Sequence, residues 1–219
     1  MSRGKLITFE GIDQTGKSTQ IELVSAWLKR RQLPVLITRE PGGTYYGRVM
    51  RDILLSGKTS LDPKAELCLM MADRAQHIWE VIAPALQEGT IVLCDRFTDS
   101  SLAYQGYGLG EDLHLIEQLN KWTTGGLTAD LTLLFDREVG SSFGDRRDAA
   151  DRIEQRDLGY KNRVRQGYLN IHAQHPKRVM RIDVTGKSKE QILDEIKPMI
   201  EKLLKTSCSR LRKNGDALA

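Results

Sequence analysis

The chain has 219 residues, of which 40% are hydrophobic and 28% are charged. This length and composition predict one globular domain with a substantial apolar core. The formal net charge of +4 is spread along the chain. Because nucleic-acid-binding proteins usually concentrate Lys and Arg on one face or tail, no nucleic-acid partner is expected, whereas a mild positive charge suits polyanions such as nucleotides.

Cysteines and apolar runs indicate the compartment. The three cysteines form no Cys-x-x-Cys pair, so no disulfide framework is expected. Glu10 ends the first apolar run too early for a signal peptide, and no stretch approaches the roughly 18 apolar residues of a membrane span. We therefore expect a soluble, cytoplasmic protein without a membrane partner.

The first elements in chain order are a strand, a loop, a helix and a second strand. Residues 5–9 form an apolar run rich in β-forming residues, and a glycine-containing loop follows. Apolar residues then recur at helical spacing, at Ile21, Val24, Trp27 and Leu28. Residues 35–38 predict another buried strand. This succession is typical of a parallel α/β sheet.

Two helices are predicted next. The first covers residues 45–55. The second is long: Asp62 and Pro63 provide an N-cap followed by proline, and the apolar pattern continues to about Glu88. Pro84 is expected to kink the end of this helix.

The remaining elements follow from the same patterns. They are, in order, a strand at residues 90–94, a short helix at about 100–105, a helix at 111–122, a strand at 131–135, a helix from about 152 to 172, a strand at 179–183 and a last helix over about 192–203. Gly106, Gly108 and Gly110 are expected to form a flexible link after the short helix.

Two segments lack any period. Residues 137–150 predict a mobile lid, and the polar tail at 206–219 is expected to be disordered. Residues 1–205 then form a single domain, a doubly wound five-stranded parallel sheet with helices on both faces. Ligands of such folds bind at the C-terminal ends of the strands, here near Gly11, Arg39, Asp95 and Asp136.

Residues 11–18 have the sequence Gly-Ile-Asp-Gln-Thr-Gly-Lys-Ser, a complete P-loop motif between a strand and a helix. The glycines let backbone N–H groups point at phosphate oxygens, and the positive end of the helix faces the same anion. Lys17 can neutralise the β- and γ-phosphates, and the Ser18 hydroxyl can bind Mg²⁺. The motif predicts a nucleoside triphosphate site formed by Gly11, Ile12, Asp13, Gln14, Thr15, Gly16, Lys17, Ser18 and Thr19.

Charged residues follow other predicted strands. Asp95 comes directly after the third strand, where its carboxylate can complete a Mg²⁺ site with Ser18, the alternative being an exposed ion pair. Arg39, Arg74 and Arg96 lie at strand ends or on an apolar helix face. Together they could clamp a second anion, although each alone is more often a surface cation.

The lid and the segment after it are rich in arginine. A basic mobile segment can close over a triphosphate, exclude water and stabilise charge on the transferred phosphoryl group. The candidates are Arg146, Arg147, Arg152 and Arg156. Three aspartates dilute this charge, so a solvated loop is the alternative; they are Asp145, Asp148 and Asp151.

Taken together, these segments resemble the bacterial type of the thymidylate kinase family. The P-loop with its flanks, residues 9–20, is similar to the P-loop of that family. The family's other motifs follow in order: Thr-Arg-Glu-Pro-Gly-Gly-Thr at 38–44, Ala-Asp-Arg-Ala-Gln-His at 72–77, Asp-Arg-Phe at 95–97, Ser-Leu-Ala-Tyr-Gln-Gly at 101–106 and Asp-Arg-Ile-Glu-Gln at 151–155. The resemblance covers roughly residues 5–205.

The resemblance implies Mg²⁺-dependent transfer of the γ-phosphoryl group of ATP to dTMP, in dTTP biosynthesis. It implies that Asp13 lies on the 3′-hydroxyl side of the acceptor sugar. Arg96 would hold the acceptor phosphate, helped by Arg39, and Arg74 would face the base and phosphate region. Tyr104 would lie beneath the sugar. Ser100, Ser101 and Gln105 would line the same pocket. A homodimer formed through the long helices is also implied.

Departures from the family pattern concern selectivity and catalysis. Met70 stands where the family commonly has a Phe that stacks on the base, so the pattern does not fix base selectivity, including tolerance for dUMP. Gln14 stands where one branch of the family has an arginine, so the lid should supply the transition-state cation. We predict Arg147 for that cation, with Arg146 next. The predicted catalytic residues are Lys17, Arg96, Arg147 and Asp13.

Two alternatives were weighed. Another nucleoside monophosphate kinase or a deoxynucleoside kinase is one, but deoxynucleoside kinases usually have Glu-Arg-Ser where this chain has Asp-Arg-Phe at 95–97. The other is a P-loop switch protein. A GTPase would need Asn-Lys-x-Asp, and residues 120–123 lack the aspartate. A transporter-type ATPase would need Leu-Ser-Gly-Gly-Gln, and residues 55–58 depart at the fourth position.

Overall fold

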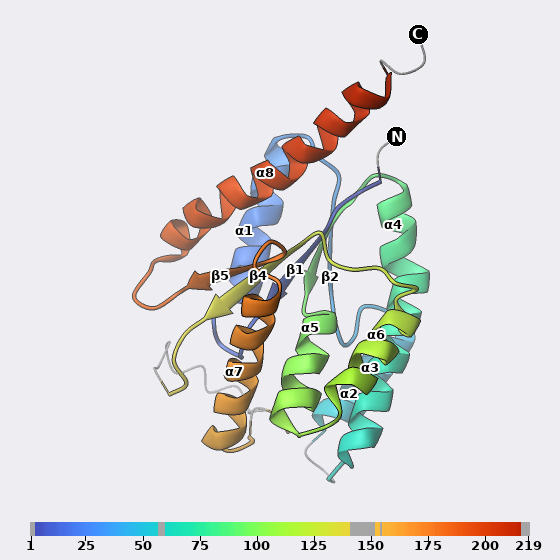
Figure 1. The fold of residues 1–219 in the computed structure, drawn as a ribbon, viewed down its shortest axis with the longest axis vertical. Helices are drawn as coiled ribbons and strands as arrows, with labels where there is room; N and C mark the ends of the chain where they lie inside the picture. The colour runs from blue at the N-terminus through green and yellow to red at the C-terminus, as the bar shows by residue number, and fades with distance from the viewer. Residues whose placement is uncertain (1–2, 57–59, 141–151, 154, 216–219) are drawn as a thin grey trace.

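The computed structural model describes residues 3–56, 60–140, 152–153 and 155–215, with side chains up to residue 205. Five strands form one sheet in the order β2-β3-β1-β4-β5, and all neighbouring pairs are parallel (Figure 1). The strands are β1 Leu6–Glu10, β2 Val35–Arg39, β3 Ile91–Asp95, β4 Leu131–Asp136 and β5 Val179–Asp183. Each lies within one residue of its predicted position, which confirms the expected sheet.

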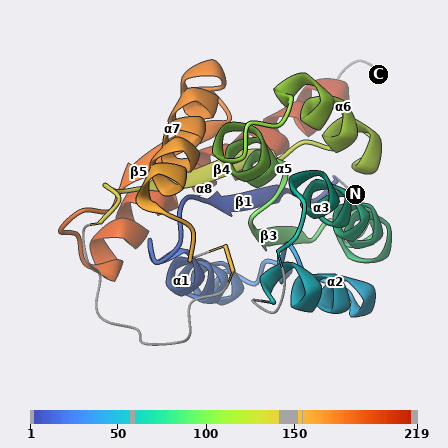
Figure 2. The same ribbon diagram turned by 90° about the horizontal axis from the view of Figure 1, so that it is seen from below.

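Helices cover both faces of this sheet. Figure 2 shows α1 on one side and α5, α6 and α7 on the other. The helices are α1 Lys17–Arg30, α2 Tyr45–Leu55, α3 Pro63–His77, α4 Ala83–Gln87, α5 Thr98–Ser101, α6 Leu113–Thr123, α7 Leu158–Gln174 and α8 Lys189–Gly215, with π-helical segments η1 Ile78–Ile82 and η2 Leu102–Gly108.

The core has two sides because consecutive residues of a strand point to opposite faces. Ile7 and Phe9 of β1 pack with apolar side chains of α1 and α8. Leu6 packs on the other face, with η1 and α4. A parallel sheet covered on both faces needs apolar residues on both, which is why these strands have continuous apolar sequences.

The long helix predicted from Pro63 to about Glu88 is present as α3, η1 and α4 in succession. Pro84 lies at the start of α4, directly after the π-helical turns of η1. Proline cannot donate a backbone hydrogen bond, and its ring crowds the preceding turn. The wider hydrogen-bonding pattern of η1 is where the helix accommodates this residue.

The flexible link predicted at the glycines after the short helix is wrong. Gly106 and Gly108 belong to η2, and both are buried. A Cβ on Gly108 would lie 2.6 Å from the Tyr160 ring, and one on Gly106 would lie 2.4 Å from Leu113. The two glycines therefore allow neighbouring helices to approach closely. Gly110, with φ at 82°, follows the end of η2.

Two helix boundaries also differ from the prediction. Helix α7 begins at Leu158, not near Arg152, because the side chain of Asp157 caps it by accepting the Tyr160 N–H at 2.7 Å. Helix α8 continues to Gly215, beyond the end predicted for the last helix at about residue 203. Residues 216–219 lie outside the described part.

Among the helices of the described residues, none combines the length and the apolar character that a membrane crossing requires.

Candidate active site

The P-loop connects β1 to α1 at the C-terminal edge of the sheet. Gly11 and Gly16 have positive φ angles of 132° and 86°, and a Cβ on Gly11 would lie 2.2 Å from the Phe135 carbonyl oxygen. Glycine is required where a backbone both takes this conformation and approaches another strand so closely. The result is a tight loop that ends at the N-terminus of α1, where backbone N–H groups favour an anion.

Lys17 lies folded back against this loop. Its side chain is buried, and Nζ donates to the carbonyl oxygens of Gly11 at 3.2 Å and Ile12 at 2.9 Å. Burial and then the charge of Arg96 lower the pKa of Lys17 to about 8, although Asp13 acts in the opposite direction. A bound polyanion would offset the desolvation of this ammonium group.

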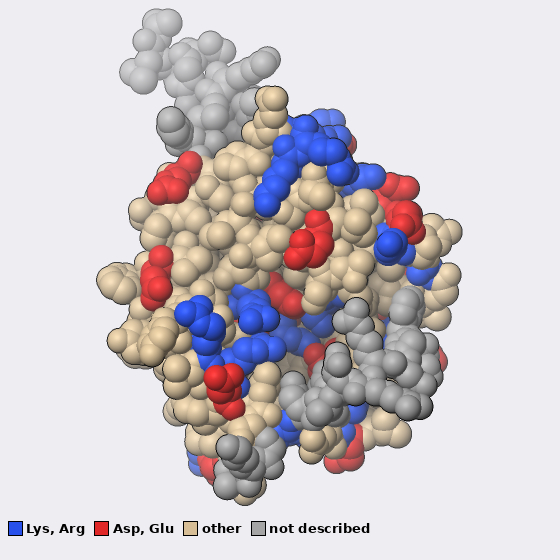
Figure 3. All heavy atoms as spheres, turned by 180° about the vertical axis from the view of Figure 1, so that it is seen from behind, with Lys and Arg blue, Asp and Glu red and all other residues tan. Residues whose placement is uncertain are grey.

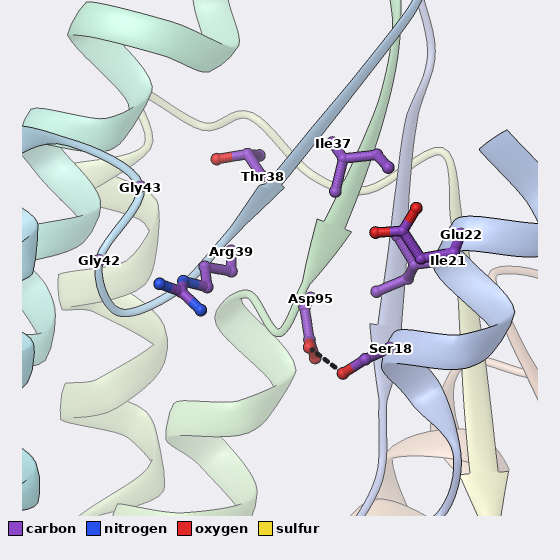
Figure 4. Close-up of a pocket in the computed structure, with 9 residues that line it drawn as sticks. All are labelled: Ser18, Ile21, Glu22, Ile37, Thr38, Arg39, Gly42, Gly43 and Asp95. Atoms are coloured by element: carbon purple, nitrogen blue, oxygen red, sulfur yellow. Dashed lines mark hydrogen bonds between the residues drawn. The ribbon is translucent and has the colours of Figure 1, made fainter.

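Ser18 and Asp95 face each other between the start of α1 and the end of β3 (Figure 4). Ser18 Oγ donates to Asp95 Oδ2 at 3.4 Å. Asp95 Oδ1 is buried and has no hydrogen-bond partner among the described residues. A hydroxyl and a carboxylate with an unused oxygen are the hard ligands that Mg²⁺ prefers, so the pair fits the predicted metal position.

A polar pocket opens beside this pair. Arg39, expected near the acceptor phosphate, lines this pocket, and the β2–β3 register places it next to Asp95. Figure 4 shows its guanidinium group beside the loop that carries Gly42 and Gly43. The lining residues are Ser18, Ile21, Glu22, Ile37, Thr38, Arg39, Gly42, Gly43 and Asp95.

A second pocket contains six of the nine residues predicted to bind the acceptor. They are Asp13, Met70, Arg96, Ser100, Tyr104 and Gln105. Its other lining residues are Glu40, Pro41, Arg51, Leu54, Leu55 and Ile153. Arg39, Arg74 and Ser101 do not line it. A lining that combines charged and polar groups with aliphatic side chains gives it the character of a site for a phosphorylated ring compound.

Arg96 lies between the P-loop and this second pocket. Its φ of 68° is uncommon for a residue with a side chain. Nη1 donates to the Gly11 carbonyl oxygen at 3.0 Å and to the Tyr168 hydroxyl at 3.2 Å, and Nη2 pairs with Asp13 Oδ1. The guanidinium carbon lies 4.9 Å from the centre of the Tyr104 ring. These contacts hold one cation against the P-loop and in the lining of the second pocket.

Asp13 carries the matching negative charge. Burial raises the pKa of this carboxyl, but Arg96 and Lys17 together outweigh burial, and the pKa is lowered. The hydroxyl of Tyr104 donates to Asp13 Oδ2 at 3.3 Å. The carboxylate is therefore anionic at neutral pH and open to the pocket it lines.

Glu10 lies behind Arg96 and is completely buried. It accepts the Phe97 N–H at 2.7 Å, the Ser100 hydroxyl at 2.6 Å and the Tyr168 hydroxyl at 2.8 Å. Burial and the charge of Asp99 raise the pKa of Glu10 to about 7. Glu10 is a functional residue that was not predicted, although a lone carboxylate at the end of an apolar strand is a signal of a buried functional group.

The structure places Arg74 behind the wall of the second pocket. This side chain is completely buried. Nε donates to Glu40 Oε2 at 2.8 Å, Nη1 to Ser101 Oγ at 3.0 Å and Asn120 Oδ1 at 2.6 Å, and Nη2 to the Phe97 carbonyl oxygen at 3.0 Å. Arg74 and Ser101 therefore support residues that line the pocket. Arg74 itself does not line the pocket, and its role beside the base and phosphate of the acceptor stays a prediction.

Helix α2 contributes pocket residues that the sequence analysis missed. Arg51, Leu54 and Leu55 line the second pocket. Arg51 Nη1 also donates to the Pro41 carbonyl oxygen at 3.0 Å. The spacing of three and four residues, which puts all three on one helix face, is the sequence signal that could have identified them.

The lid prediction falls largely outside the described residues. Arg146 and Arg147 lie there, so their positions are not described. Arg152 and Arg156 are described, and both bind the buried carboxylate of Glu66, at 2.6 and 2.7 Å. These two arginines thus pair with helix α3.

Lys and Arg side chains gather around a hollow on the face of the molecule opposite to that of Figure 1 (Figure 3). A concave surface with this charge favours anionic ligands, because it raises their local concentration.

Comparisons with known proteins agree with this geometry. The family model described as thymidylate kinase matches residues 9–196. A thymidylate kinase of an Exiguobacterium strain is 48% identical over 196 residues, which cover 88% of this chain and 92% of that protein. One from Gloeobacter violaceus is 43% identical over 211 residues, which cover 94% of this chain and 99% of that protein.

A solved structure gives the same result. The crystal structure of thymidylate kinase from Ehrlichia chaffeensis superposes with a TM-score of 0.77 at 33% sequence identity. The match covers 91% of this chain and 99% of that one.

Proposed function

The chain belongs to the thymidylate kinase family and phosphorylates dTMP with ATP as co-substrate, and on this premise we propose that ATP binds at the P-loop while dTMP binds in the pocket around Arg96. The observation that carries this proposal is the position of Arg96, which contacts the P-loop through Gly11 and also lines the second pocket. Phosphates held on its two sides would lie next to each other, as in-line transfer requires.

On the donor side, the backbone N–H groups of residues 11–19 would surround the phosphates of ATP. Lys17 would leave the carbonyl oxygens of Gly11 and Ile12 and bind a phosphate oxygen. Ser18 and Asp95 would hold Mg²⁺, which supplies charge neutralisation on the phosphate oxygens. Arg39 lines the pocket beside this pair, so we assign it to a phosphate oxygen reached from that side.

On the acceptor side, Arg96 would hold the phosphate of dTMP. Asp13 would face the sugar, and Tyr104 would pack beneath it. Met70 and the aliphatic residues of α2 would contact the base. Ser100 and Gln105 would line the same pocket, and Ser101 would lie behind its lining. Arg74 would act as a positioning residue through Glu40 and Ser101. Arg147 remains our proposal for the lid cation, and residues 1–205 for the single domain.

We also propose a cytoplasmic homodimer whose partners are nucleotides, with no nucleic acid and no membrane. Helix α3 packs against both α2 and α6, and this helical layer exposes large apolar side chains. They are Tyr46, Val49, Ile53, Trp79, Leu115 and Trp122. Exposed apolar side chains gathered on neighbouring helices are typical of a protein–protein interface.

The proposal is tested by ADP formation from ATP in the presence and absence of Mg²⁺. The assay is run without acceptor and then with dTMP, dUMP, CMP, AMP and GMP in turn. We expect a strong dTMP-dependent rate that needs Mg²⁺, a weaker rate with dUMP and background rates with the others. Hydrolysis that is independent of any acceptor would contradict the assignment of the second pocket.

A further inference from the structure

The amide of Gln105 is held at one end only. Gln105 lines the acceptor pocket and is 2% exposed. Its Nε2 donates to Glu66 Oε1 at 2.9 Å, whereas its Oε1 is buried and has no partner among the described residues. A carboxylate can only accept hydrogen bonds, so the amide nitrogen must face Glu66 and the carbonyl oxygen must face the other way.

Glu66 is itself held as an anion. It is completely buried on α3 and accepts from Arg152 Nη2 at 2.6 Å and from Arg156 Nη2 at 2.7 Å. Burial alone raises the pKa of Glu66, but the hydrogen bonds from Gln105, Arg152 and Arg156 outweigh it, and the pKa is lowered. Glu66 therefore stays a pure acceptor at neutral pH, which keeps the Gln105 amide from flipping.

The two arginines are anchored in turn. Arg152 Nε donates to the Leu54 carbonyl oxygen at 3.0 Å, and Arg156 Nη1 donates to the Tyr160 hydroxyl at 2.6 Å. The Arg156 guanidinium also stacks over the Tyr160 ring, 4.6 Å from its centre. The orientation of the Gln105 amide is thus fixed by a chain of contacts that reaches α2 and α7.

We propose that Glu66 is a positioning residue for base selection, because it makes Gln105 present a hydrogen-bond acceptor to the base of the acceptor nucleotide. This inference rests on the proposed function of the pocket. Thymine and uracil carry an N–H at the ring nitrogen of their imide, which can donate to Gln105 Oε1. Cytosine has a lone pair at that nitrogen, so two acceptors would face each other in a buried site, a pairing that strongly disfavours binding.

The experiment compares kcat/KM for dTMP and dCMP in four proteins: the wild type, Glu66→Gln, Gln105→Leu and the double variant. We expect wild type to prefer dTMP by about a hundredfold or more. A glutamine at position 66 can donate or accept, so the Gln105 amide can rotate, and the preference should narrow by about tenfold. In the Gln105→Leu background the Glu66→Gln change should have no further effect on the ratio.

Asp130→Asn is the control, because Asp130 is also a carboxylate that accepts from a cation, Lys5 Nζ at 3.1 Å, and it lies before β4, at the edge of the sheet opposite to the pockets. It should leave the ratio of dTMP to dCMP unchanged.

The proposal would be overturned if Glu66→Gln left the ratio of kcat/KM for dTMP to kcat/KM for dCMP unchanged. It would also be overturned if Glu66→Gln lowered this ratio by the same factor in the Gln105→Leu background as in the wild type. If Glu66→Gln does not fold, Gln105→Leu still decides, because it breaks no ion pair: full retention of dTMP preference would overturn the proposal. Absence of dTMP phosphorylation by the wild-type protein would instead refute the function of the pocket.

Discussion

At the scale of single residues, the candidate site contains buried charged groups that differ in their burial and in the charges next to them. Arg96 takes a left-handed backbone conformation, and the next N–H, that of Phe97, donates to the buried Glu10 carboxyl. The same carboxyl accepts hydrogen bonds from the hydroxyls of Ser100 and Tyr168, and Arg96 donates to both of these hydroxyls. Glu10 therefore links the strand β1 to the turn that aims Arg96, and its protonation state bears on stability.

We predict that Glu10→Gln changes how stability depends on pH. The pKa of Glu10 is raised to about 7 in the folded protein, from 4.5. The folded state then binds the proton of Glu10 more tightly than the unfolded state does. The free energy of unfolding that this proton contributes is complete below about pH 4.5 and is lost as the pH rises to about 7. Relative to wild type, Glu10→Gln should gain stability over this window, by an amount on the order of 3 kcal/mol.

Urea unfolding of both proteins between pH 4.5 and 8 measures this difference. Glu117→Gln, at an exposed glutamate of α6, serves as the control for the substitution itself. A constant difference from wild type for Glu10→Gln would show that Glu10 ionises normally in the folded protein.

At the scale of helices and strands, the sequence predicts those elements that a short stretch of residues determines by itself. The five strands are apolar runs with clear ends, and the P-loop is a contiguous motif, so both were predicted correctly. The flexible link at Gly106 and Gly108 was wrong because their role is to let η2 approach other helices, which no local pattern reveals. The same limit applies to Arg74, whose partners come from three other segments of the chain.

We predict that Gly108→Ala destabilises the protein by about 1 to 3 kcal/mol, because overpacking forces helices apart or side chains off their rotamers. The new methyl group would lie 2.6 Å from the Tyr160 ring and 2.9 Å from a Val164 methyl group. Thermal unfolding measures the change, and Val164→Ala in the Gly108→Ala background should recover part of the loss. An unchanged or raised unfolding midpoint in Gly108→Ala would show that η2 and α7 are not packed this closely.

At the scale of the whole molecule, both pockets lie at the C-terminal edge of one sheet, and the layer of α2, α3 and α6 leaves apolar side chains in solvent. Trp79 is 74% exposed and Trp122 is 78% exposed. Covering two tryptophans of this kind would contribute several kcal/mol to association, since each aromatic side chain can bury about 150–250 Å².

We therefore predict that the purified protein sediments as a dimer and that Trp79→Glu combined with Trp122→Glu shifts it to a monomer. Analytical ultracentrifugation gives the mass directly. Leu158→Glu is the control, because Leu158 is an exposed apolar residue on α7, which is not one of these three helices, and it should leave the dimer intact. A wild-type monomer, or a dimer in the double variant, would exclude this face as the interface.

The most direct test of the two-pocket site is Arg96→Met, measured by steady-state kinetics and by MgATP binding. The guanidinium group lies between the P-loop and the acceptor pocket, so its loss should lower kcat/KM for dTMP by about 10²–10³-fold, while the Kd for MgATP changes by less than about threefold. Arg163→Met, at an arginine that does not line the pocket, should leave both values near those of wild type. An Arg96→Met protein with near-normal kcat/KM for dTMP, or one that loses only MgATP binding, would contradict the placement of dTMP around Arg96.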